Sequence, residues 1–290
     1  MQSRREIMSR IKSVKKTRQI TSAMHLIAAS QYKRAQIKLA TTMPYFRKIQ
    51  DTIADILAHS EKFPHPYLGD KESKGERRVG YIVISGDKGL CGSYNHNVIK
   101  LAEENIKKTS NNYLMVIGNV GRDYFAKKNY NIDVEFMYTA QNPTIYTARD
   151  IADIVLKLYN RDFLDEIYIV YTQIISALSQ KPTVMRLLPL ELKNFDLDEK
   201  INKTDHYQFM YHPSPEEVFN EMVPEYIKGL IYGAMVESFA SEQGARMTAM
   251  DSATKNADEM IKKLTLMYNR ARQAQITQEI QEIVVAANSL

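Results

Sequence analysis

The residues best placed for chemistry lie in one short loop, SGDKGLCGSYN, at positions 85–95. Its three glycines follow an apolar, β-branched run and precede a run with helical spacing. Backbone amides at such a turn can cradle a phosphate group. The glycine spacing, however, matches neither GxxxxGK(S/T) nor GxGxxG, the two common phosphate-binding patterns. We therefore interpret the loop as a tight strand-to-helix connection that needs glycines for its backbone geometry.

Cys91 is the single cysteine of the chain and lies in the same loop. A thiol at a helix N-terminus can act as a nucleophile, but no partner histidine can be assigned, and small buried cysteines are more common than reactive ones. A single cysteine also excludes an internal disulfide and a cysteine-rich zinc site.

Other titratable residues give no catalytic pattern. The six histidines are scattered, and no two have the spacing of a helical metal site. Glu279 and Glu282 are one helical turn apart, which suits acid–base work, but nothing else near them would build a pocket. We expect no catalytic residue, no metal site and no cofactor.

Charge is unevenly distributed along the chain. The formal net charge is +5, yet residues 1–50 carry +11 and residues 214–290 carry −4. Opposite charges suit two helices that lie side by side, and the excess positive charge must face solvent or an acidic partner. Nucleic acid is a weaker alternative, because the basic segment offers few aromatic side chains for base stacking.

The elements that must position these residues begin with a long N-terminal helix. Apolar or small residues recur every three, four or seven positions through residues 1–60, which is the seam of an irregular coiled coil. Pro44 interrupts the pattern and predicts a kink, because the spacing resumes after it. A mitochondrial presequence would also be basic, but this periodicity continues well beyond the reach of a cleaved peptide.

A different pattern follows a linker at residues 61–76, which is rich in proline, glycine and charge. Alternating strands and helices predict an inserted Rossmann-like α/β domain over residues 77–205, with a mostly parallel sheet of about five strands. The expected strands are 79–85, 113–117, 134–138, 167–174 and 185–190. The expected helices are 97–108, 121–128 and 148–159.

A second long helix occupies the C-terminal segment, residues 206–290. Ser214 and Pro215 form a helix start, and the 4-3-4-3 spacing of the seam shifts to another helix face near Gln275. We expect the two end segments to pair as an antiparallel coiled coil, with the tip at residues 276–290 projecting alone. The apolar runs are far shorter than the roughly 18 to 20 residues that cross a bilayer.

Three stretches resemble the γ subunit of bacterial F-type ATP synthases. They are IKSVKKTRQITSAMHLIAASQYKRAQ, the loop SGDKGLCGSYN, and SEQGARMTAMDSATKNADEMIKKLTLMYNRARQAQITQEIQEIV. The resemblance covers both ends and the centre of the chain. It implies a non-catalytic central rotor stalk that transmits torque between a c-ring and a hexamer of α and β subunits, coupling proton or Na⁺ translocation to ATP synthesis and hydrolysis.

The resemblance also implies partners and a location. The α, β and ε subunits and the c-ring are the expected partners, and nucleotide chemistry belongs to β. Because Met1 directly precedes the family's first helix, we expect a peripheral protein at the cytoplasmic face of a bacterial plasma membrane.

Individual positions match the family's contact residues. The positions that match contacts with the α/β hexamer are Met24, Lys88, Arg246, Gln273, Thr277, Glu279 and Glu282. Phe209, Tyr211 and His212 fall where the family contacts its c-ring, and His212 departs from the acidic residue of some relatives.

Two alternatives are open on the residues alone. A free-standing nucleotide-binding enzyme with helical arms would use the loop at positions 86–92. A coiled-coil adaptor would instead form a homodimer through its long helices.

Overall fold

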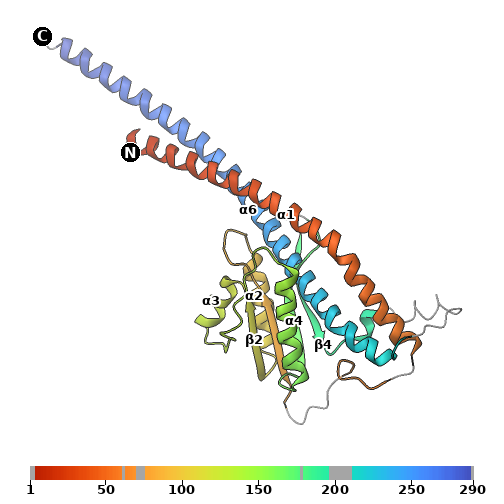
Figure 1. The fold of residues 1–290 in the computed structure, drawn as a ribbon. Helices are drawn as coiled ribbons and strands as arrows, with labels where there is room; N and C mark the ends of the chain where they lie inside the picture. The colour runs from red at the N-terminus through yellow and green to blue at the C-terminus, as the bar shows by residue number, and fades with distance from the viewer. Residues whose placement is uncertain (1–3, 61–62, 70–75, 177–178, 196–210, 289–290) are drawn as a thin grey trace. The chain divides into compact units, whose positions relative to one another are not determined.

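The computed structural model describes residues 4–60, 63–69, 76–176, 179–195 and 211–288. The chain divides into two compact units, residues 1–29 with 246–290 and residues 30–245. Two long helices, α1 (Arg4–His59) and α6 (Pro215–Asn288), each contribute to both units (Figure 1). No helix in the described ranges is long and apolar enough to cross a membrane.

α6 starts at a serine cap, and α1 continues through a proline. The Ser214 side-chain oxygen accepts a hydrogen bond from the Glu217 amide at 3.2 Å, which satisfies one of the unpaired donors of the first turn of α6. Glu216 and Glu217 add negative charge at this positive helix end. Pro44 lies inside α1 without ending it.

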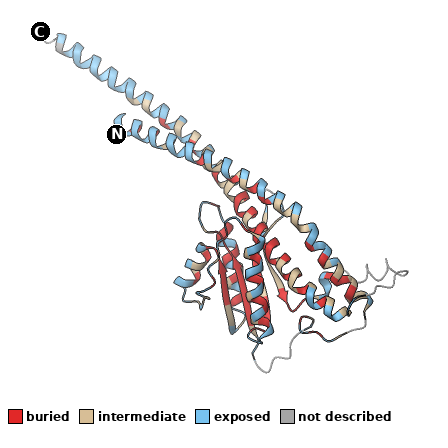
Figure 2. Cartoon of the chain, viewed as in Figure 1, coloured by how far each residue is buried: buried red, intermediate tan, exposed pale blue. Residues whose placement is uncertain are grey.

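The first unit is an antiparallel pair of helical segments from α1 and α6. Its apolar contact joins Ile7 and Ile11 to Leu264. A polar layer lies farther along the pair, where the Thr21 and Thr254 hydroxyl oxygens are 2.7 Å apart and Arg18 pairs with Asp258 at 2.6 Å. Beyond the apolar contact, all the described side chains of residues 272–285 are exposed (Figure 2).

The second unit is built on a four-stranded sheet with the order β2-β1-β3-β4. The strands are β1 (Arg78–Ile84), β2 (Asn111–Ile117), β3 (Glu166–Ile174) and β4 (Gln180–Leu188). β1 runs parallel to β2 and β3, with Ile82 opposite both Met115 and Ile169, whereas β4 is antiparallel to β3. The predicted α/β class is confirmed, with a mixed sheet rather than five mostly parallel strands.

Helices cover both faces of this sheet. Apolar side chains of α2 (Tyr94–Ile106) and α3 (Asn119–Lys127) pack on one face, in a cluster with Val83 and Val116. α4 (Ile145–Asn160) and the parts of α1 and α6 within this unit pack on the other, in a cluster with Ile84 and Ile169. A short 3₁₀ helix, η1 (Leu192–Phe195), follows β4.

The segment 134–138, expected as a strand, is not one. Residues 132 and 138 make only isolated parallel bridges to β2. Between them, the Met137 amide donates to the Glu135 carbonyl oxygen at 2.9 Å and the Glu135 amide donates to the Asp133 carboxylate at 3.0 Å. These local turns use amides that a strand ladder would need, so the alternating apolar residues do not form a strand.

The connection from α1 to β1 is more closely packed than its composition suggests. His65 and Tyr67 are buried. The His65 ring lies 4.9 Å from the Phe219 ring, and its Nε2 atom is 2.9 Å from the Asn220 Oδ1 atom. The described part of this segment therefore anchors the connection to α6.

α1 and α6 approach closely within the second unit because α6 carries glycines there. A Cβ atom at Gly229 would overlap the Phe46 ring, and one at Gly233 would lie 3.5 Å from the Met43 sulfur. Small residues at these positions let the larger side chains of α1 fill the helix–helix contact.

Candidate functional site

The 85–95 loop is held by side chains at its own base. The Ser85 Oγ atom accepts from the Gly121 amide at 2.9 Å and donates to the Ile117 carbonyl oxygen at 3.1 Å. A Cβ atom at Gly121 would lie 2.6 Å from this Oγ atom. The glycine thus lets the start of α3 close directly onto the end of β1.

Asp87 ties the loop to two neighbouring segments. Its Oδ1 atom accepts from the Asn119 amide at 3.2 Å, and its Oδ2 atom accepts from the Ala140 and Gln141 amides at 3.0 and 3.1 Å. Hydrogen bonds from backbone amides to a carboxylate are charge-assisted and strong. Asp87 therefore fixes the loop against both the start of α3 and the segment before α4.

Asn95 closes the loop from its other end. Its Oδ1 atom accepts from the Gly86 amide at 2.7 Å, and its Nδ2 atom donates to the Lys88 carbonyl oxygen and the Cys91 sulfur, both at 3.2 Å. Cys91 is 1% exposed. The Gly86 amide therefore already has a partner within the protein, which supports the interpretation of the loop as a turn. The burial of Cys91 supports its interpretation as a packing residue.

The tip of the loop is open to solvent. Lys88, Gly89 and Leu90 are all exposed, and Leu90 has a φ of 62° with 64% of its surface accessible. A bulky residue with positive φ is strained and persists only where its surroundings fix the backbone. The loop thus combines a fixed base with a tip that presents one cation and one apolar side chain.

The base of the loop rests on α6. A Cβ atom at Gly86 would lie 3.1 Å from the Glu242 Cδ atom, so this carboxyl group sits directly on the glycine. Tyr94, at the start of α2, is buried beside it; burial, and secondly the charge of Glu242, raise the pKa of Tyr94 well above its usual value. Two serines of α6, Ser238 and Ser241, complete the contact by hydrogen bonding to the backbone of β3.

Residue composition alone did not reveal this polar contact. Ser238, Ser241 and Glu242 are buried polar residues of α6 that follow the apolar run of residues 230–236, and polar residues on a buried helix face were the available signal. Glu237, in the same segment, is a second buried acid, and burial raises its pKa to about 7. The carboxylate charge of Glu237 also contributes to raising the pKa of Tyr171 on β3, although burial is the larger cause.

Six of the predicted contact residues lie in the first unit. One of them, Arg246, is half-buried and is the residue at which the C-terminal part of this unit begins. Met24 is half-buried, whereas Gln273, Thr277, Glu279 and Glu282 are exposed. Each of the two acids accepts a hydrogen bond from a glutamine one turn earlier, at 2.8 Å for Glu279 and 2.9 Å for Glu282.

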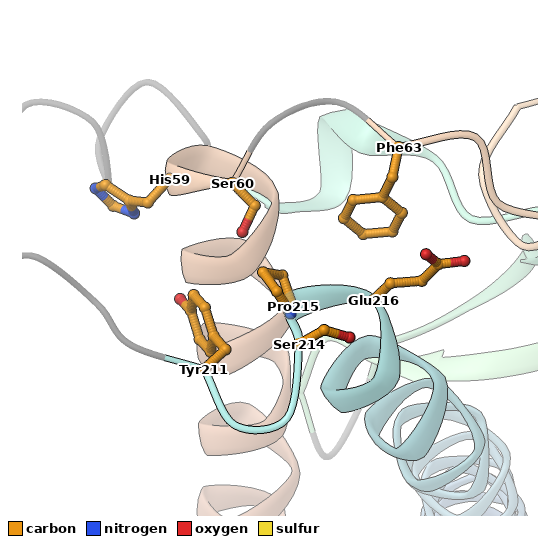
Figure 3. Close-up of a pocket in the computed structure, with 7 residues that line it drawn as sticks. All are labelled: His59, Ser60, Phe63, Tyr211, Ser214, Pro215 and Glu216. Carbon is orange, nitrogen blue, oxygen red and sulfur yellow. The ribbon is translucent and has the colours of Figure 1, made fainter.

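A pocket of about 480 Å³ lies between the end of α1 and the start of α6 (Figure 3). Tyr211, one of the predicted c-ring residues, lines it, and burial, followed by the charge of Asp55, raises the pKa of Tyr211. His212 is exposed next to it, and Phe209 lies outside the described residues. The other lining residues are His59, Ser60, Phe63, Ser214, Pro215 and Glu216.

Among the described residues, no group of three or more histidine, cysteine, aspartate or glutamate side chains could hold a metal ion. The sites that the structure offers are therefore surfaces: the loop tip, the exposed end of α6 and the pocket at the α6 start.

Comparison with known proteins identifies close relatives over the full chain. A family model described as ATP synthase matches residues 3–290. The ATP synthase gamma chain of Ruminiclostridium cellulolyticum is 52% identical over 288 residues, covering 99% of this chain and 98% of the relative. That of Acetivibrio thermocellus is 48% identical over 289 residues, covering 98% of each. A gamma chain named as sodium ion specific, from Acetobacterium woodii, is 39% identical over 298 residues, covering 98% of each.

Solved structures show the same fold. A chain in the OSCP/F1/c-ring structure of the Euglena gracilis mitochondrial ATP synthase matches with a TM-score of 0.69 and 18% identity, covering 99% of this chain and 94% of that one. A chain of the central stalk and c-ring of the Tetrahymena thermophila mitochondrial enzyme matches with a TM-score of 0.54 and 22% identity, covering 81% and 99%.

Proposed function

Because the chain belongs to the ATP synthase family, as a gamma chain, we propose that it is the rotor shaft that transmits torque between a c-ring and a catalytic hexamer of α and β subunits. It is part of an enzyme complex and itself does no chemistry. Catalysis resides in β, and the shaft changes the conformation of each catalytic site in turn as it rotates.

One observation carries this proposal: the bare end of α6. All the described side chains of residues 272–285 are exposed. They include the apolar side chains of Ile280, Ile283 and Val284, whose contact with water is unfavourable. A surrounding sleeve of other subunits would cover these side chains. Such a sleeve is what a rotating shaft requires.

The contacts with the hexamer are assigned from the positions that match the family's contact residues. We assign them to two regions, the loop tip at Lys88 and the helical positions Met24, Arg246, Gln273, Thr277, Glu279 and Glu282. The excess of lysine and arginine in residues 1–50 suits nearby acidic loops of β, because opposite charges attract within about 10 Å at 0.1 M salt and are largely screened beyond that distance.

The contact with the c-ring is assigned to the α6 start. Tyr211 and His212 lie there, and Phe209 is two positions before Tyr211 in the sequence. The pocket that Tyr211 lines is open to a partner side chain. We assign the ε subunit to the α/β domain, as in the family, and place the protein peripherally at the cytoplasmic face of a bacterial plasma membrane, coupled to protons or Na⁺.

The alternative of a nucleotide-binding enzyme has little support from the loop geometry. The Gly86 amide donates to Asn95, and the Gly118 amide at the end of β2 donates to the Tyr138 carbonyl oxygen at 3.1 Å. A phosphate would have to displace these internal partners. Equilibrium dialysis of the full chain against ATP and NAD tests this alternative, and stoichiometric binding would favour it.

The central test is reconstitution. The chain should be co-expressed with the α and β subunits of its own source, and the complex assayed for ATP hydrolysis and, with the membrane sector, for ATP-driven ion pumping. We expect pumping to require the chain. Pumping that proceeds without it would refute the shaft function, and a stable homodimer in sedimentation would favour a coiled-coil adaptor instead.

A further inference from the structure

The contact between the 85–95 loop and α6 leaves little room for a side chain at position 86. A Cβ atom at Gly86 would lie 3.0 Å from the Asn95 Oδ1 atom, 3.1 Å from the Glu242 Cδ atom and 3.2 Å from its Oε1 atom. All three distances are shorter than ordinary van der Waals contact. Glu242 is 2% exposed, so its carboxyl group is packed onto the loop backbone rather than hydrated.

The same stretch of α6 is bonded to the sheet. The Ser238 hydroxyl oxygen accepts from the Thr172 amide at 3.1 Å, and the Ser241 hydroxyl donates to the Thr172 carbonyl oxygen at 3.1 Å. Ser238 and Ser241 are 1% and 0% exposed. Two serines from one helix face thus bind both backbone groups of a single residue of β3, and buried hydrogen bonds of this kind are costly to break.

We propose that Glu242 is a positioning residue that, seated on Gly86, locks the 85–95 loop to α6 so that force applied at Lys88 passes directly into the shaft helix. The inference rests on the proposed function, because it takes Lys88 as a contact with the hexamer.

The tip and the base of the loop differ in how firmly they are held. Three residues at the tip are exposed. At the base, Asp87 accepts a hydrogen bond from the Asn119 amide at the start of α3, and Asn95 accepts one from the Gly86 amide. The Glu242 carboxyl group packs against Gly86. A side chain on an otherwise free loop yields when it is pushed. A side chain on this loop pushes on α6, because the carboxyl group and the glycine are already in contact.

A double-mutant cycle tests the proposal in the assembled complex. Lys88→Ala, Glu242→Gln and Glu242→Ala are made singly and in combination. Glu225→Gln serves as a control, since Glu225 is a half-buried acid of α6 that pairs with Lys228 at 2.7 Å. The measured quantity is the number of ions pumped per ATP hydrolysed. Residues that act through one contact show non-additive effects in such a cycle, whereas independent residues show additive ones.

We expect Lys88→Ala to lower the pumping ratio at least about twofold in the parent and to have no further effect once Glu242 is alanine. Glu242→Gln keeps the shape of the side chain and should retain most of the coupling, and Glu225→Gln should leave the Lys88→Ala effect unchanged. Thermal unfolding of each chain is measured alongside, so that lost coupling is separated from lost fold.

Two results overturn the inference and are distinguishable. If Lys88→Ala does not change the number of ions pumped per ATP in the parent, the proposed contact between Lys88 and the hexamer is wrong, and so is the positioning role of Glu242. If Lys88→Ala has the same effect with and without Glu242, the contact stands and the positioning role is wrong. Gly86→Ala, which presses on Glu242 from the loop side, gives an independent check if the Glu242→Ala chain does not fold.

Discussion

Replacing Glu103 with glutamine should make the chain less stable at neutral pH, by an amount that disappears in acid. Glu103, on α2, accepts hydrogen bonds from Lys128 at 2.9 Å, Tyr124 at 2.8 Å and Tyr130 at 3.1 Å. Hydrogen bonds from Lys128 and then Tyr124 lower the pKa of Glu103 from 4.5 to about 2. This cluster joins α2 to α3 and its C-terminal connection.

The size of the effect follows from the pKa difference. A fall from 4.5 to about 2 corresponds to at most about 3 kcal/mol at 1.36 kcal/mol per unit. The lysines that bind the carboxylate, Lys107 and Lys128, are 64% and 45% exposed, so solvent screens their contribution. We expect about 1–2 kcal/mol.

The pH dependence gives the sign. The pKa of Glu103 is lower in the folded chain than in the unfolded chain, so its stabilisation is fully present above about pH 4.5 and is lost as the pH falls towards about 2. Urea unfolding of the parent and of Glu103→Gln should therefore differ at pH 7 and converge near pH 2. A difference that is equal at both pH values would refute the electrostatic explanation.

Three further predictions concern the packing of α6. Burial raises the pKa of Glu237 to about 7, so the parent chain loses stability as the pH rises and this acid ionises. Glu237→Gln should therefore raise the free energy of unfolding in urea by about 1–3 kcal/mol more at pH 8 than at pH 5. An equal effect at both pH values would contradict this explanation. Gly229→Ala would force a Cβ atom into the Phe46 ring and should lower the free energy of unfolding by about 1–3 kcal/mol, measured by thermal unfolding. Phe46→Leu in the same chain should recover part of that loss. If Gly229→Ala leaves the stability unchanged, α1 and α6 are not in tight contact at this point. Thr21→Val and Thr254→Val should each cost about 0.5–1.5 kcal/mol in thermal unfolding, because each removes the 2.7 Å contact between the two hydroxyls. The remaining hydroxyl keeps a backbone carbonyl partner, Arg18 for Thr21 and Met250 for Thr254. The double variant should cost less than the sum, and strict additivity would mean that the two hydroxyls do not interact.

The sequence was sufficient to predict those helices and strands whose formation depends on residues close together in the chain. Helix α6 begins where a serine cap and a proline predict it, because the capping hydrogen bond from Glu217 to Ser214 joins residues only three positions apart. The apolar, β-branched strands β1, β2 and β3 were found for a similar reason. The direction of β4 was not predictable, since a β-branched run has the same composition in either orientation.

In the candidate site, the local loop was predictable from the sequence, whereas its contact with α6 was not. The loop at positions 85–95 was recognised from its glycines, and its interpretation as a turn agrees with the hydrogen bonds of Asn95 and Ser85. The role of Gly86 as a seat for Glu242 was not predictable, because it depends on two distant segments meeting. Segment 134–138 has the alternation of a strand, but turns at Asp133 and Glu135 take its amides.

The seating of Glu242 on Gly86 also constrains how this protein can change over evolutionary time. Each position limits the other: a larger residue at 86 has no room while an acid occupies 242, and a shorter residue at 242 leaves a gap over the glycine. Neither can drift alone without cost, although they lie far apart in the chain. Among related chains the two positions should therefore be inherited as a pair, and lineages that have altered one of them should have altered the other as well.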